Sequence, residues 1–494
     1  MRNRKVLLGL ACLAANGMLL STAHADRRTG LSGNLLIQDA DDVFPFPQHA
    51  VTYRNMIRLD YGPGAGPNAA VGSSGNGVLT LGDENSAYGV ALHRGDLFSP
   101  DIVGQSQELQ WLGGVGDPFG DTAYGSFGAP ATPTVGGAAG PVLPATVFDL
   151  FYARTMGNNL FGLRLGFARG VQAQTVDGDT AKGASSVIAA QVGYSMLPPE
   201  GLRLDLSGNV VFALGKSTDG AGDDVNSGMD IRLGLLGRGY YPINPVLDIG
   251  FIGNLSVNNE SSSLDDPKDS SNDLSIGLMA GVGPSINLER AKVAAYGGLA
   301  LGFGQNEPSD ETDDDEVSTL AFAAPMVNMA TEVQLLDWLY VRTGAQYTWG
   351  LTRTGFKVGG DDASERRAAS TFGWTAGLGV TKDNFSFDGV VTNGFVTGGP
   401  NFIGGTAPGF LAMASATYRF GDVFSGEGTA PQEAGAVEAP APAPAPPPPP
   451  AVEPEPAQET EAAPAVDAAA TGTSTTTDTS VGVGGSVGGS IGTP

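Results

Sequence analysis

Long segments of this chain alternate apolar and polar residues with a period of two. From Leu202 to Leu214, leucine, valine and phenylalanine occupy even-numbered positions, whereas Arg203 and Asp205 begin the polar, odd-numbered set. Successive side chains of a β-strand point to opposite faces, so such a segment has one apolar and one polar face. The chain is therefore predicted to be all-β.

The same alternation recurs in segments that begin at Phe161, Ile231, Leu274, Leu339 and Phe372. Many of these segments reach the roughly 9 to 11 residues with which a tilted strand crosses a bilayer, whereas a soluble strand usually has about 5 to 6. Beyond the N-terminal leader, no stretch has 18 consecutive apolar residues, which disfavours a helical membrane protein. The pattern favours a transmembrane barrel over a soluble β-sandwich.

Two kinds of connection join the predicted strands. The tight turns are 157–159, 198–201, 241–245 and 382–384. The long acidic loops are 216–227, 258–273, 305–316 and 357–367. Short turns on one side and longer loops on the other are typical of an outer-membrane barrel, with both chain ends on the periplasmic, tight-turn side.

The alternation gives sixteen candidate strands, with fourteen as the alternative because the first three are weak. They begin near Asn55, Asn76, Ser86, Thr146, Asn159, Ala184, Leu202, Ser227, Pro245, Asn272, Ala291, Val317, Trp338, Ala368, Phe385 and Gly409. Residues 95–145, rich in glycine, proline and alanine, are expected outside the barrel or folded into its lumen. Aromatic residues such as Trp338 and Trp349 are expected at the boundary between lipid and water.

The first 25 residues have the pattern of a secretory signal peptide. A basic start is followed by an apolar stretch up to Leu20 and by the small residues Ala23 and Ala25, which predicts cleavage before Asp26. Lipidation at Cys12 is the alternative, but Gly9 stands where such sites usually carry leucine. Cys12 is the only cysteine, so the mature chain is predicted to form no disulfide.

Four parts of the chain follow from these patterns: the signal peptide 1–25, an N-terminal periplasmic or plug segment 26–54, the outer-membrane barrel 55–424 and a tail 425–494. The tail is rich in proline, alanine, threonine and glycine, and it has too few large apolar residues to form a core. We predict a disordered periplasmic tail, which could act as a spacer and contact peptidoglycan.

The charge balance excludes one class of partner. The formal net charge is −26, and removal of the three basic residues of the leader makes it −29, so nucleic acid is an improbable partner. The acidic runs 265–269 and 310–316 are interpreted as solvated outer loops that share divalent ions with lipopolysaccharide, with calcium binding as the alternative.

Charged residues also mark the inward, polar faces of the strands. Such charges are costly at membrane depth unless they face water or a partner. The side chains that we predict to line the lumen are Arg58, Asp60, Arg164, Arg203, Asp205, Asp230, Arg232, Arg238, Asp248, Arg342, Asp388 and Arg419. They could line an open pore, whose slight positive excess would favour small anions or zwitterions, or they could form ion pairs that fill and stiffen the barrel.

No catalytic or cofactor motif stands out. Only His49 and His93 remain after processing, and neither lies in a nucleophile or carboxylate motif. No phosphate loop, metal-ligand cluster or haem motif is present. The sequence therefore predicts no cofactor and no enzyme, with an outer-membrane hydrolase that uses His93 as the remaining alternative.

The alternating strand 410–420 ends in Tyr418-Arg419-Phe420. It resembles the closing strand of Gram-negative outer-membrane barrels, and the resemblance implies recognition by the barrel assembly machinery. A second resemblance is to the outer-membrane long-chain fatty-acid transporter family, in which an N-terminal segment precedes the first strand and can plug the barrel. Residues 41–47 occupy that place here, although the family's Asn-Pro-Ala signature is missing.

Taken together, the sequence predicts a porin-like channel or transporter for small solutes in the outer membrane, surrounded by lipid and lipopolysaccharide. The alternative is a non-transporting structural or adhesive barrel, displayed at the surface and tethered to the cell wall by its tail. Because β-barrels carry out unrelated functions, this step depends on analogy of fold.

Overall fold

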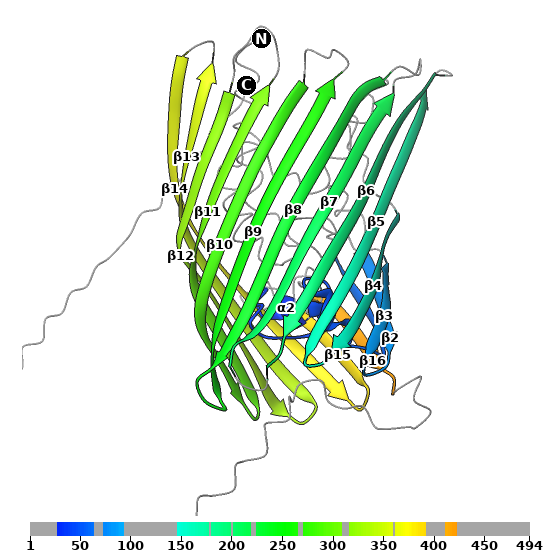
Figure 1. Cartoon of the computed structure of the whole chain (residues 1–494), viewed down its shortest axis with the longest axis vertical. Coiled ribbons are helices and arrows are strands. Elements are labelled where there is room, and N and C mark those ends of the chain that lie inside the picture. The colour runs from blue at the N-terminus through cyan, green and yellow to red at the C-terminus, as the bar shows by residue number, and fades with distance from the viewer. Residues whose placement is uncertain are drawn as a thin grey trace, which may run out of the picture. The chain divides into compact units, whose positions relative to one another are not determined.

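The wall of the molecule is a single closed sheet of sixteen antiparallel strands (Figure 1). The computed structural model describes residues 27–63, 73–92, 146–176, 179–198, 201–218, 224–264, 270–308, 316–358, 361–391 and 411–421. Each strand pairs with its neighbours in the chain, and β1 pairs with β16, where Arg58 lies opposite Thr417. The prediction of an all-β antiparallel barrel is confirmed, with the larger of the two strand numbers.

The strands of the wall are β1 (Met56–Pro63), β2 (Ser73–Gly82), β3 (Ser86–Leu92), β4 (Thr146–Met156), β5 (Asn159–Val176), β6 (Asp179–Met196), β7 (Arg203–Thr218), β8 (Asp224–Pro242), β9 (Leu247–Leu264), β10 (Ser270–Leu288), β11 (Ala291–Pro308), β12 (Glu316–Leu336), β13 (Leu339–Val358), β14 (Asp361–Lys382), β15 (Phe385–Val391) and β16 (Leu411–Arg419). Most begin within three residues of the predicted position, whereas β6 and β14 begin earlier.

The predicted long loops are much shorter than expected, because the strands continue into them. Residues 357–367 were expected to be a loop, yet β13 runs to Val358 and β14 starts at Asp361. Likewise, β9 and β10 occupy most of 258–273. The apolar face of a strand ends where the bilayer ends. Backbone hydrogen bonds between strands do not require an apolar face, so the strands continue to pair through polar sequence.

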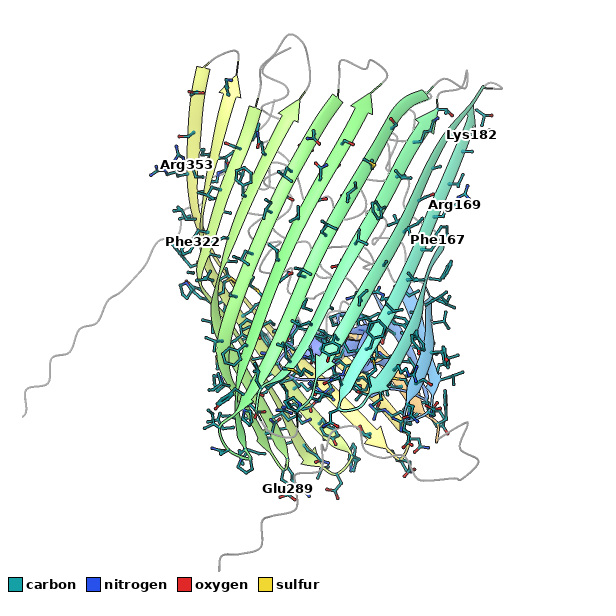
Figure 2. All side chains as sticks on the ribbon, in the orientation of Figure 1. Phe167, Arg169, Lys182, Glu289, Phe322 and Arg353 are labelled. Carbon is teal, nitrogen blue, oxygen red and sulfur yellow. The ribbon has the colours of Figure 1, made fainter. Side chains whose placement is uncertain are left out.

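The outer face of the wall is apolar along the part nearest the tight turns. Phe372 is 68% exposed, Leu235 is 59% exposed and Leu165 is 57% exposed, and all three lie on the face that the alternation marks as apolar. Figure 2 shows such side chains standing outward from the strands. A closed barrel with an apolar exterior is stable when hydrocarbon surrounds it, which locates this chain in the outer membrane. Within the described residues, no helix is long and apolar enough to cross a membrane.

Two exposed tryptophans indicate how much of the wall the bilayer covers. Trp338 precedes β13 in the tight turn and Trp349 lies in the middle of that strand. At about 3.3 Å per residue and a tilt of about 40°, they are roughly 28 Å apart along the barrel axis, near the ~25 Å height of an outer-membrane apolar band. Trp349 is at a boundary but not at a strand end, because β13 continues beyond it.

Several sequence predictions lie outside the described residues. They are the signal peptide with Cys12, the segment 95–145 with its neighbour His93, the acidic runs 265–269 and 310–315, and the tail 425–494.

Candidate functional site

Residues 27–55 form a segment that lies inside the barrel near the tight turns, and we refer to it as the inner segment. It contains the helical turns α2 (Arg27–Gly30), η1 (Ala40–Val43) and η2 (Pro47–Ala50). It contacts inward side chains all round the wall, including Thr375 on β14 and Ser195 on β6. Figure 1 shows α2 enclosed by the strands.

Local sequence explains two of these turns. The side chain of Asp39 accepts a hydrogen bond of 2.9 Å from the backbone nitrogen of Asp41 and so caps η1. Pro47 begins η2, where its missing N–H has no partner to lose. The inner segment is thus held in short turns and does not add a strand to the wall.

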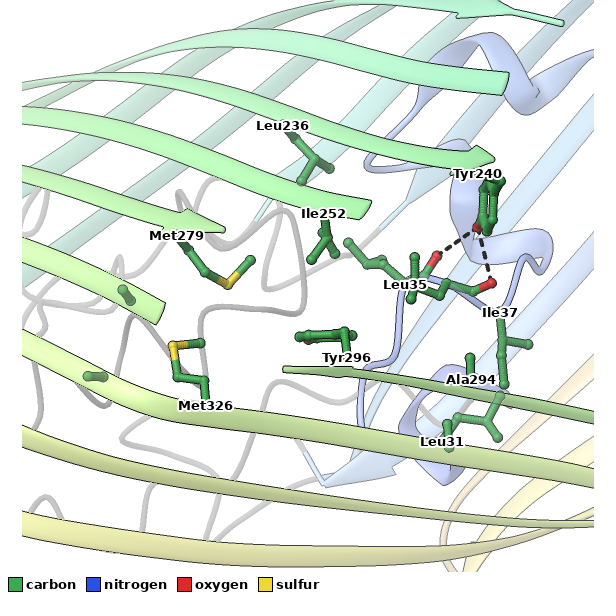
Figure 3. Packing of buried hydrophobic residues seen from close by; sticks show 14 of the residues in the cluster. Leu31, Leu35, Ile37, Leu236, Tyr240, Ile252, Met279, Ala294, Tyr296 and Met326 are labelled. Atoms are coloured by element: carbon green, nitrogen blue, oxygen red, sulfur yellow. Dashed lines mark hydrogen bonds between the residues drawn. The ribbon is translucent and has the colours of Figure 1, made fainter. Parts of the chain in front are cut away.

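An apolar cluster fixes one half of the inner segment to the wall (Figure 3). Leu31, Leu35 and Phe46 are fully buried in it, beside Ile252 and Met279 of the wall. The hydroxyl of Tyr240 on β8 donates to the carbonyl oxygen of Leu36 at 3.1 Å. Together these contacts remove apolar surface from water and pair one backbone carbonyl of the segment.

Arg238 on β8 is the central charged contact. Its guanidinium lies 2.6 Å from Asp42 of the inner segment and 2.7 Å from Asp205 on β7, and it donates to the Leu35 carbonyl at 3.0 Å. The ring of Phe46 lies 4.5 Å from the same group. This fully buried cation is therefore neutralised from both the wall and the inner segment.

His49 contacts the same carboxylate as Arg238. Its Nε2 lies 3.1 Å from the carboxylate of Asp205, and Ser195 donates to that carboxylate at 2.5 Å. Serine, histidine and aspartate thus meet, but both the hydroxyl and the ring bind the carboxylate and the hydroxyl does not bind the ring. In a nucleophilic triad the hydroxyl contacts the ring, so these three residues do not have the geometry of such a triad.

Two aspartates of the inner segment share Arg28, which pairs with both Asp39 and Asp42. Burial raises the pKa of Asp39, although Arg28 lies 2.9 Å away. Burial alone would also raise the pKa of Asp42, but the charges of Arg238 and Arg28 hold it below its usual value. Asp42 is thus the anion that these two arginines stabilise.

Further charged contacts join the segment to other parts of the wall. Arg58 pairs with Asp41 and, at 2.8 Å, with Asp60. Arg164 donates to the Phe44 carbonyl at 3.3 Å and lies 3.1 Å from Asp149. On β12, β13 and β15, a chain of pairs runs from Arg27 through Glu332 and Arg342 to Asp388, each link being 2.5 or 2.6 Å long.

The structure separates the sequence-predicted residues into three groups. Those that contact the inner segment directly are Arg58, Arg164, Asp205 and Arg238. Those that touch it through another residue are Asp60, Arg342 and Asp388. The others are the buried pair Asp230–Arg232 at 2.5 Å, the partly exposed pair Arg203–Asp248 at 2.7 Å, and half-buried Arg419.

Sequence reasoning missed several partners, including Asp149, Ser195, Asn328 and Glu332. Each occupies an inward position of its strand, so the alternation could have identified them. Asn328, for example, donates to the Ser32 carbonyl at 2.9 Å. Within the described residues, no group of three or more histidines, cysteines or acidic residues is arranged to hold a metal ion.

Comparison with known proteins gives fold-level likeness only. No family model matches the chain, and no curated protein sequence matches it. Among solved structures, it is similar to CdiB from Escherichia coli, with a TM-score of 0.35 and 10% identity over 74% of this chain and 62% of that chain. The FrpB iron transporter from Neisseria meningitidis gives a TM-score of 0.32 and 10% identity over 67% of this chain and 61% of that chain. The siderophore receptor PiuA from Acinetobacter baumannii gives a TM-score of 0.32 and 8% identity over 50% of this chain and 46% of that chain.

The match spans less than two thirds of each of those three chains. The assignment of this chain therefore depends on its own geometry, a wall of sixteen strands that closes on itself, an apolar exterior and a charged interior. On that geometry, the chain is a β-barrel of the outer-membrane type.

Proposed function

We propose that this barrel is an outer-membrane channel or transporter for small solutes and that the inner segment plugs it. One observation carries the proposal. A sixteen-strand wall encloses a space too wide for its own side chains to fill, and a separate segment, joined to the wall by charged and apolar side-chain contacts and not by strand pairing, occupies it near the tight turns. Such contacts can be exchanged for water, so the segment can leave the wall without breaking a strand.

The twelve inward arginines and aspartates predicted from the sequence are the proposed pore lining. A path lined by both signs of charge suits small ions and zwitterions, and the solute itself is left open. Outer-membrane lipid, lipopolysaccharide, the barrel assembly machinery and, through the tail, peptidoglycan are the proposed partners. No enzymatic role is proposed.

A disulfide between the inner segment and the wall tests the proposal. Ser32 and Thr375 place their hydroxyl oxygens 2.9 Å apart, so S32C/T375C would join the segment to β14. The mature chain is predicted to contain no other cysteine. Oxidised protein should give neither liposome swelling with small sugars nor conductance steps in a planar bilayer, and reduction should restore both. The single variants S32C and T375C, treated in the same way, control for the oxidant.

Equal flux through the oxidised and reduced protein would show that the segment does not control passage. The second candidate, a non-transporting structural barrel, is favoured by the buried ion pairs Arg58–Asp41 and Arg238–Asp42, which bind the segment to the wall. It predicts no flux in the reduced double variant, and none when Arg238, the central contact, is also replaced.

A further inference from the structure

Two arginines face each other on the outside of the wall. Arg353 on β13 lies directly opposite Arg366 on β14 in the strand register. Both side chains are exposed. Arg353 shares its face with Trp349 and Leu351, which are outward, and Figure 2 shows it pointing away from the barrel. Directly opposed residues of an antiparallel pair have Cβ atoms about 4.5 to 5.5 Å apart, so the two cations are neighbours.

Nothing in the described part of the chain balances this pair. No hydrogen bond or ion pair joins Arg353 or Arg366 to a described residue. The adjacent charges are balanced: Arg367, on the other face, donates to Glu365 at 2.6 Å, and Lys357 lies opposite Asp362 in the register. Like charges directly opposite each other destabilise a sheet, so this pair favours an anion between its members.

The pair lies where the bilayer surface should be. Arg353 follows Trp349 by four residues, which is roughly 10 Å along the barrel axis on the loop side. Leu320 on β12 lies directly opposite Arg353 on its other side and is 57% exposed. A ligand here would meet two guanidinium groups and, immediately beside them, an apolar surface for acyl chains.

We propose that Arg353 and Arg366 bind a phosphate group of lipid A, the acylated sugar phosphate of lipopolysaccharide, in the outer leaflet. A guanidinium presents paired N–H donors that match the oxygens of a phosphate, and two of them on neighbouring strands can hold one phosphate from both sides. The neighbouring leucines then contact the acyl chains. The proposal rests on the position of the wall in the membrane and not on transport, so it can fail or succeed independently of the proposed function.

The test compares binding of lipid A to three forms of the full chain, each folded in detergent and checked by heat-modifiable migration. They are the unchanged protein, R353A/R366A and the control R154A, which removes an exposed outward arginine of β4 near the tight turns. Native mass spectrometry with bisphosphorylated lipid A should show at least a tenfold weaker affinity for R353A/R366A, because this variant lacks both guanidinium groups that donate charge-assisted hydrogen bonds to the phosphate. R154A should bind like the unchanged protein.

Further arms identify the source of the phosphate. Dephosphorylated lipid A and inorganic phosphate should both bind the unchanged protein weakly, because one lacks the anion and the other lacks the acyl chains. Equal affinity of R353A/R366A and unchanged protein, or an equal loss in R154A, would overturn the proposal. So would full affinity for dephosphorylated lipid A. If the alanine variant does not fold, R353K/R366K keeps the charges without the paired donors and should bind with intermediate affinity, whereas undiminished binding would count against the proposal.

Discussion

At the scale of single residues, Arg238 connects two parts of the molecule that are far apart in the chain. A buried cation is stable only when anions or carbonyls surround it, and here Asp205 comes from the wall while Asp42 comes from the inner segment. The guanidinium of Arg238 is neutralised by both carboxylates together, one from the wall and one from the inner segment. Arg238 therefore contributes to the position of the inner segment, beside the apolar cluster and the other ion pairs to the wall.

Replacing Arg238 with alanine should release the inner segment, because Asp42 and Asp205 would remain buried without their shared cation. Removing one member of a buried charge network costs about 3 to 5 kcal/mol. Release can be measured as the reactivity of A50C, a buried position of η2, with a water-soluble maleimide. R203A is the matched control, since its pair with Asp248 is partly exposed. Unchanged reactivity in R238A would contradict the central position of this residue.

The two aspartates that share Arg28 should respond differently to neutralisation. The pKa of Asp42 is lowered, so its contribution to docking is present above its usual pKa of about 3.9 and is lost as the pH falls through the lowered value. The pKa of Asp39 is raised by burial, so its ionised form opposes docking at neutral pH. At pH 7, D42N should increase maleimide labelling of A50C, whereas D39N should leave it unchanged or decrease it. Equal labelling of the two variants would show that ionised Asp42 and ionised Asp39 do not differ in their contribution to docking.

At the scale of elements, η2 packs closely against β5 because Gly162 of that strand has no side chain. A Cβ at Gly162 would lie 2.1 Å from the backbone nitrogen of Gln48, which is too close for any L-residue without movement. G162A should therefore push η2 away from the wall at a cost of about 1 to 3 kcal/mol and expose A50C. G253A is the control, because a Cβ there would lie 3.7 Å from the carbonyl oxygen of Met279, which is ordinary van der Waals contact. Equal labelling of both variants would contradict this close packing.

The strands were predictable from sequence because each has one apolar face, as in Phe161 to Phe167 and Leu339 to Trp349. Their outer ends were not, since beyond the bilayer both faces are polar and the ladder leaves no periodic signal. The arginines of the inner wall were also visible in the alternation. Their partners in the inner segment were not, because contacts such as Arg238 with Asp42 join residues 196 positions apart and depend on a non-repeating fold.

At the scale of the whole molecule, stability depends on hydrocarbon around the wall. Leu235 on β8 faces outward within the apolar band, and arginine there should destabilise the folded barrel by roughly 2 to 4 kcal/mol. The control is S227R, on the same strand and the same face but nearer the loops. Urea unfolding in lipid vesicles, followed by tryptophan fluorescence, measures the free energy of unfolding of both variants. If S227R loses as much folding stability as L235R, the bilayer extends further toward the loops than the tryptophans indicate.

The composition of the inner segment has an electrical consequence. It holds three arginines and three aspartates, so with His49 neutral it has no net charge. Work done by a membrane potential scales with the charge displaced, about 2.3 kcal/mol per elementary charge per 100 mV. Withdrawal of this segment as one body should therefore be almost insensitive to voltage, and steps recorded in a planar bilayer should be equally frequent at either polarity.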